Sequence, residues 1–172
     1  ANHYKPRTVH YAQILLWRYF FKEPTKDFSP QTTNQILDAA FESAARLLET
    51  QVKPHNAQNT DDHSAFKQQF ELVKSLNFHI RIKHPSEYLH LFLTDKYSPK
   101  QAQLAECIIS DSFLCPCCLL YKPIVIAEGA AVMAAGMTKA LDSVAPQTTK
   151  SISFIQDMKF YYQHSKNEYQ QS

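Results

Sequence analysis

The chain has 172 residues, of which 44% are apolar and 20% are charged, so it can bury a substantial core and is not intrinsically disordered. Its net charge of +2 excludes the strongly basic surface that electrostatic binding of nucleic acid requires. Only 2 glycines are present, which disfavours the tight turns of β hairpins and predicts an all-α protein.

The first half of the chain predicts three helices. Apolar side chains recur at helical spacing in all three. The middle helix begins with Ser29 as an N-cap and Pro30 at the first helical position, and small residues cover most of its circumference. Such a helix is typical of the centre of a bundle, so we expect the chain to be organised around it. The three predicted helices span residues 8–21, 30–49 and 64–76.

The second half of the chain predicts four more helices, at residues 85–97, 100–113, 123–141 and 149–164. Ser98 and Pro99 repeat the start signal of the middle helix in the first half. The alanine-rich stretch GAAVMAAG at 129–136 is similar to DAAFESAA at 38–45. This weak internal repeat predicts two similar helical lobes, residues 1–84 and residues 85–172.

The residues that usually carry chemistry do not form a recognisable site. Cys115, Cys117 and Cys118 are close in sequence, but C-x-C-C lacks the C-x-x-C spacing of a structural zinc site and has no second pair. We interpret them as reduced, structural cysteines at a joint between helices. No nucleophile with a base and no phosphate-binding loop is recognisable, so we expect no enzyme activity, no catalytic residues, no cofactor and no metal. No apolar run is long enough to cross a membrane, and no membrane partner is expected.

Four stretches, in the right order, resemble motifs of the cyclin family. YAQILLWRYFF at 11–21 is similar to the first motif, with Arg18 in the place of its arginine, and AAFESAARLLE at 39–49 is similar to the central helix. QFELVKSLNFHIRIKHPSEYL at 69–89 resembles the segment that ends the first lobe. SDSFLCPCCLLYKPIVIAEGAA at 110–131 resembles the second-lobe signature of the transcription-type cyclins C, H, T, K, L and Q.

This resemblance implies a tandem pair of cyclin-box lobes and a protein that activates a kinase without chemistry of its own. The implied partner is a transcriptional cyclin-dependent kinase, whose catalysis requires its C-helix to be held inward. The implied substrate of that kinase is the C-terminal repeats of RNA polymerase II. A nuclear location and a larger transcription complex follow from the same resemblance. The residues implied to bind the kinase are Arg46, Leu47, Glu49, Gln69, Val73, Phe78 and Ile80.

The chain departs from the family pattern at three places. Arg46 replaces a lysine and Gln69 replaces a glutamate, so a charge-assisted link of about 1.5–3 kcal/mol becomes a weaker neutral hydrogen bond. Leu48 replaces one member of an acidic pair of which Glu49 is kept. The first seven residues are too polar to form the helix that precedes the first cyclin motif, so the first lobe is expected to be incomplete or trimmed.

Some of these residues also have an ordinary structural interpretation. Arg46 could pair with Glu42 or Glu49 at helical spacing on the surface, which contributes a few tenths of a kcal/mol. Leu47 and Val73, together with Phe78, could belong to an ordinary core. The implied contacts with a kinase therefore depend on the family resemblance.

Other functional classes stay open. The main alternative is a kinase-independent cyclin-fold scaffold in a nuclear protein complex, which the departures at Gln69 and Leu48 favour. A paired cyclin fold that binds DNA needs a denser basic face than the separated segments KHP, KYSPK and YKP supply. Direct nucleic-acid binding is therefore not expected. An enzyme of unrelated helical fold is the remaining alternative.

Overall fold

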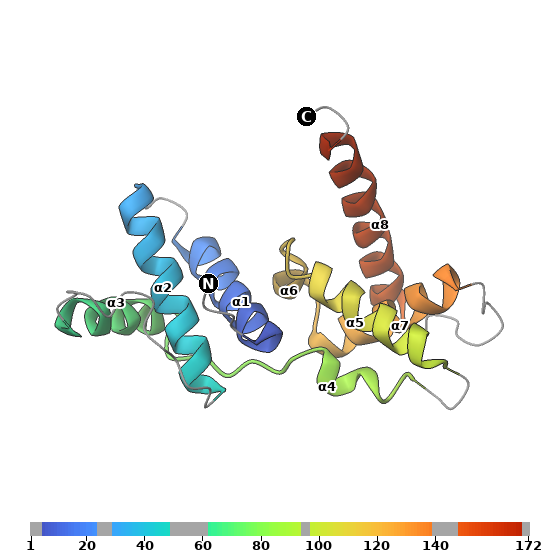
Figure 1. The fold of residues 1–172 in the computed structure, drawn as a ribbon, viewed down its shortest axis with the longest axis horizontal. Coiled ribbons are helices and arrows are strands. Elements are labelled where there is room, and N and C mark those ends of the chain that lie inside the picture. Colours follow the sequence, from blue (N-terminus) through green and yellow to red (C-terminus); the bar gives the residue numbers. More distant parts are fainter. Residues whose placement is uncertain (1–4, 24–28, 49–61, 94–96, 139–147, 170–172) are drawn as a thin grey trace. The chain divides into compact units, whose positions relative to one another are not determined.

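The structure is a computed structural model that describes residues 5–23, 29–48, 62–93, 97–138 and 148–169. The described residues form eight helices and no strand, so the predicted all-α class is confirmed (Figure 1). The chain divides into two compact units, Ala1–Ile82 and Lys83–Ser172. That each unit is a cyclin-box lobe stays a prediction.

The first unit consists of α1 (Pro6–Lys22), α2 (Pro30–Leu47) and α3 (Asp62–Ser75). Helix α2 packs against both α1 and α3, so it has the central place in this unit (Figure 1). Ser29 caps it as predicted, because its hydroxyl oxygen accepts a hydrogen bond from the Thr32 N–H at 3.3 Å. Ala40 and Ala44 are fully buried, and such small side chains allow the neighbouring helices to approach closely.

The core of the first unit is built from one face of each of its three helices. Large side chains of α1 and α3 meet the alanines of α2, whereas the larger apolar residues of α2 are only half-buried at the edge of this core. The burial of α2 thus rests on its small residues more than on its leucines and isoleucine. The buried core residues are Tyr11, Ala12, Leu15, Tyr19, Ala40, Ala44, Leu72 and Leu76.

Three donors on α1 hold the C-terminal end of α3 and the extended segment that follows it. The Tyr11 hydroxyl donates to the Ile82 carbonyl at 2.8 Å, and Arg18 Nη1 donates to the His79 carbonyl at 3.2 Å. Lys22 Nζ donates to the Ser75 carbonyl at 2.5 Å. The path of the chain after α3 is therefore fixed by side chains of the first helix.

The second unit contains α4 (Ser86–Leu89), α5 (Pro99–Asp111), α6 (Cys117–Leu120), α7 (Pro123–Met137) and α8 (Thr149–Tyr169). Helix α7 contacts the other four and is buried along most of its length (Figure 1). We expected the whole chain to be organised around residues 30–49. Instead, each unit has a central helix of its own, α2 in the first and α7 in the second. Gly129 of α7 lies against the ring of Phe154, where a Cβ atom would overlap the ring.

Buried polar groups in the second unit fix the start of two helices. Ser98 and Gln101 form a capping box at α5, and Gln101 Nε2 also donates to Thr138 Oγ1 at 2.8 Å. Glu128, only 4% exposed, accepts hydrogen bonds from Ser151 Oγ at 2.5 Å and Thr148 Oγ1 at 3.3 Å. These contacts attach the N-terminus of α8 to the middle of α7.

The structure differs from the predicted elements in two places. In the described part of the helix predicted at 85–97, which leaves out residues 94–96, the structure has only the short α4, followed by turn hydrogen bonds such as Leu91 N–H to the Tyr88 carbonyl at 3.0 Å. The bonds of the Leu91 and Phe92 N–H groups reach back three residues and do not propagate an α-helix, and only the Leu93 N–H reaches back four, to the Leu89 carbonyl. The joint between helices that was predicted around Cys115, Cys117 and Cys118 contains a short helix of its own, α6. None of the described helices has the length and apolar character needed to cross a membrane.

Candidate partner-binding groove

A groove of about 320 Å³ lies between α2, α3 and the segment after α3. We call it the α2–α3 groove. It brings together five of the seven residues that the cyclin resemblance singles out, namely Arg46, Leu47, Gln69, Val73 and Ile80. The other residues that line it are Ser43, Phe66 and Phe70.

Helical spacing explains why these side chains share one surface. The residues of α2 that line the groove are spaced three and four apart, as are those of α3, so each set lies on one helix face. Ile80 comes from the extended segment that the α1 donors hold. The walls are mainly apolar, because Leu47, Val73 and Ile80 contribute to them. Each of these three residues is half-buried.

Exposed aromatic side chains surround this groove. Phe66 and Phe78 are each 62% exposed, and Phe70 is 46% exposed. The rings of Phe70 and Phe78 meet edge to face, with centroids 6.2 Å apart. An exposed cluster of large apolar side chains on a small unit is typical of a protein-binding surface.

The chain turn that presents Phe78 is strained. Asn77 and Phe78 have φ angles of 52° and 60°, in the left-handed region that costs a residue with a side chain about 1–2 kcal/mol. Asparagine tolerates this conformation, whereas a bulky residue such as phenylalanine rarely adopts it. The turn is closed by a hydrogen bond from the Phe78 N–H to the Val73 carbonyl at 3.0 Å. The strain is therefore held in place by the α3 terminus and by the α1 donors beyond it.

Gln69 has a different partner from the one expected. Its side chain is only 7% exposed, and its amide Nε2 donates to the Glu42 carboxylate of α2. The cyclin resemblance implied a neutral hydrogen bond between Gln69 and Arg46. The expected bond would have used Gln69 Oε1 as an acceptor for Arg46, whereas the observed bond uses Nε2 as a donor to Glu42. A hydrogen bond to a charged group contributes about 1.5–3 kcal/mol, so the contact with Glu42 is a strong one.

The Arg46 side chain is exposed and makes no hydrogen bond or ion pair with another residue of the described part of the chain. Glu42 lies one helical turn before it, so a carboxylate and a guanidinium are neighbours at the groove although Gln69 is the residue bonded to Glu42. Glu49, the remaining residue of the predicted set, lies outside the described residues. The kinase-binding role of these residues stays a prediction.

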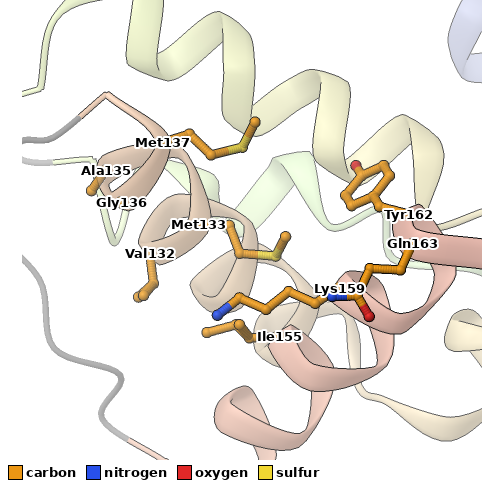
Figure 2. Close-up of a pocket in the computed structure, with 9 residues that line it drawn as sticks. All are labelled: Val132, Met133, Ala135, Gly136, Met137, Ile155, Lys159, Tyr162 and Gln163. Carbon is orange, nitrogen blue, oxygen red and sulfur yellow. The ribbon is translucent and has the colours of Figure 1, made fainter. Parts of the chain in front are cut away.

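A second groove, of about 570 Å³, was not anticipated from the sequence. It lies between α7 and α8 of the second unit, and Figure 2 shows the Lys159 side chain extended beside Met133 and Ile155. Its walls combine the exposed end of α7 with one face of α8. The hydrophobic pattern of α7 gave no signal for it, because that helix is apolar on all sides.

No three histidine, cysteine, aspartate or glutamate side chains of the described residues gather in a way that could hold a metal ion. The chain was compared with protein-family models and with curated proteins, and neither comparison gave a match.

Proposed function

We propose that the chain is a cyclin-type regulatory subunit that binds and activates a transcriptional cyclin-dependent kinase, with the C-terminal repeats of RNA polymerase II as the substrate of that kinase. The observation that supports this function best is the α2–α3 groove, which gathers five of the residues matched to the cyclin pattern. Phe78, a sixth, contacts Phe70 at its edge.

The groove suits an amphipathic helix of the partner. Such a helix places its apolar stripe in a hydrophobic groove, and Val73 and Ile80 would form the floor. The exposed guanidinium of Arg46 would then bind carbonyl oxygens at the C-terminal end of that helix, where the helix dipole attracts a cation. For a kinase this helix is the C-helix, whose glutamate must be held against the ATP-anchoring lysine for catalysis.

Affinity capture from a nuclear extract tests this proposal. The baits are the native chain, an Arg46→Glu, Phe78→Ala variant and a Phe21→Ala control, and bound proteins are identified by mass spectrometry. Phe21 is a matched control because it is 77% exposed and does not line the groove. We expect a cyclin-dependent kinase with the native bait and with Phe21→Ala, and at least a tenfold loss with the groove variant.

The captured kinase is then purified and assayed on a peptide of the polymerase repeats with and without the chain. Activation by the native chain and not by the groove variant supports the proposal. A kinase that binds all three baits equally, or no kinase with any bait, contradicts it. The proposal includes the nuclear location that the cyclin resemblance implies, and recovery of the endogenous chain in a nuclear fraction tests it.

One observation favours the second candidate, a cyclin-fold scaffold that holds a nuclear complex together without activating a kinase. Gln69 is turned toward Glu42 instead of joining Arg46, so the polar link by which a cyclin is expected to organise its kinase contact is absent from the described residues. A scaffold would retain non-kinase proteins through the same groove. It would leave the activity of any bound kinase unchanged.

A further inference from the structure

Sulfur atoms converge at the joint between α5 and α7 in the second unit. Cys115 Sγ lies 3.2 Å from Cys117 Sγ, and the sulfur of Met158 on α8 lies 4.0 Å from the first and 3.9 Å from the second. Only Pro116 separates the two cysteines, with a φ of −72°. The proline ring fixes this angle, so the backbone between the two thiols has little freedom to separate them.

We propose that Cys115 and Cys117 form a reactive dithiol that a peroxide oxidises reversibly to an intramolecular disulfide. Cys115 is half-buried and accessible to a small oxidant, whereas Cys117 is only 4% exposed. Cys115 is therefore the thiol that meets the peroxide, and Cys117 is the thiol that resolves the product. This inference does not depend on the proposed kinase partner.

The reaction proceeds in two balanced steps. The Cys115 thiolate attacks one oxygen of hydrogen peroxide, the O–O bond breaks, hydroxide leaves, and Cys115 becomes a sulfenic acid. The Cys117 sulfur then attacks the sulfenic sulfur, the S–O bond breaks, and the departing hydroxide takes the Cys117 proton as water. Overall, two thiols lose two hydrogens and one peroxide becomes two waters.

The electrostatics of the pair support this division of roles. The hydrogen bond between the Cys115 and Cys117 side chains lowers the pKa of Cys115 to about 7, although burial acts in the opposite direction. The same hydrogen bond, together with burial, raises the pKa of Cys117. A thiol whose pKa lies near the ambient pH combines a large thiolate fraction with good nucleophilicity.

Intact-mass spectrometry of the full chain tests this inference. The protein is reduced, treated with hydrogen peroxide near stoichiometry, and measured before and after a thiol-alkylating reagent. We expect the mass to fall by two hydrogens, two of the four thiols to become unreactive, and dithiothreitol to restore both. Exposed Cys107 and half-buried Cys118 serve as the controls.

Variants then assign the bond. A Cys107→Ser, Cys118→Ser protein should still lose two hydrogens, whereas Cys115→Ser should not. Cys117→Ser should stop at the sulfenic acid of Cys115, which dimedone traps as an adduct. A disulfide that persists in Cys115→Ser, or one that is absent from the Cys107→Ser, Cys118→Ser protein, overturns the proposal.

A measurement on the native chain covers the case in which a serine variant fails to fold. All four cysteines lie on one tryptic peptide, residues 101–139, because trypsin does not cut between Lys122 and Pro123, so chymotrypsin is used to cut after Phe113 and separate Cys107. Tandem mass spectrometry of the remaining fragment should place the bond between Cys115 and Cys117. A bond to Cys118, or oxygen addition without loss of two hydrogens, overturns the proposal.

Discussion

Phe78 combines an exposed ring with a backbone conformation that suits glycine. Its φ is 60°, and its side chain stands at the edge of the α2–α3 groove beside Phe70. Strained residues of this kind persist where the surrounding structure holds them, and they concentrate at functional positions. The strain is consistent with a residue retained for binding at a cost to the stability of the fold.

Replacement of Phe78 by glycine and by alanine distinguishes the contribution of the ring to partner binding from the cost of the backbone strain to stability. Both variants lack the ring and should lose partner binding equally. Phe78→Gly should have a free energy of unfolding larger than Phe78→Ala by about 1 kcal/mol, because only glycine is relieved of the left-handed penalty. Urea denaturation measures the difference.

The same pair of substitutions at His79 is the control. His79 is exposed, follows Phe78 directly and has no positive φ. His79→Gly should have a free energy of unfolding smaller than that of His79→Ala by about 0.5–1 kcal/mol. This difference is opposite in sign to the one expected at Phe78. Equal stability of Phe78→Gly and Phe78→Ala would contradict a left-handed turn at this position.

The Gln69 side chain donates a hydrogen bond to a carboxylate, so its replacement by glutamate should destabilise the fold. Gln69→Glu places a second carboxylate against Glu42 in a nearly buried site, which removes a charge-assisted hydrogen bond and adds repulsion. We expect the free energy of unfolding to fall by about 2 kcal/mol at pH 7. Gln31→Glu, in the exposed first turn of α2, should be neutral or slightly stabilising.

An unchanged stability of Gln69→Glu would show that Glu42 can move away and that Arg46 can reach position 69. That result would restore the link that the cyclin resemblance implies. The sequence could not reveal the Glu42 partner, because a glutamine on one helix gives no sign of which side chain of another helix it meets. It was the cyclin resemblance that singled out Arg46 and Leu47 on α2 and Gln69 and Val73 on α3, and these four residues do line one groove.

At the scale of elements, the same chemical change at the two glycines of α7 should have opposite effects. A Cβ at Gly129 would overlap the fully buried ring of Phe154, whereas a Cβ at Gly136 meets nothing within 4 Å. Gly129→Ala should lower the free energy of unfolding by about 1–2 kcal/mol, because overpacking outweighs the gain in helix propensity. Gly136→Ala should raise it by about 0.5–1 kcal/mol.

Thermal unfolding followed by circular dichroism measures both variants against the native chain. If the free energy of unfolding changed in the same direction in both variants, that result would contradict the close contact between α7 and α8 at Gly129. Gly136 is the internal control for helix propensity, because it lies on the same helix and is exposed.

Sequence patterns predicted the elements that have explicit start signals. Ser29–Pro30 and Ser98–Pro99 mark the N-termini of α2 and α5, because a proline at the first helical position and a serine before it act locally. The short α4 was predicted as a long helix, because its apolar residues suit helix and turn equally. The α7–α8 groove could not be predicted, because its walls depend on how two helices pack in three dimensions.

At the scale of the whole molecule, the two units should unfold separately. The core that surrounds α2 is built only from residues of the first unit. The chain has 1 tryptophan, Trp17 on α1, so its fluorescence reports on the first unit, whereas circular dichroism reports on helices of both. Gly129→Ala should therefore shift part of the dichroism transition in urea and leave the Trp17 transition unchanged.

Leu72→Ala is the reciprocal variant. Leu72 is 2% exposed in the first core, so its truncation should cost about 2–5 kcal/mol and move the Trp17 transition to lower urea. If Gly129→Ala also moves that transition, the units unfold together and the prediction is wrong. If Gly129→Ala leaves the Trp17 transition unchanged, some urea concentrations will unfold the second unit of this variant and not the first. At those concentrations the α2–α3 groove should still bind its partner. Partner binding measured across the same urea series then shows whether the first unit alone carries recognition.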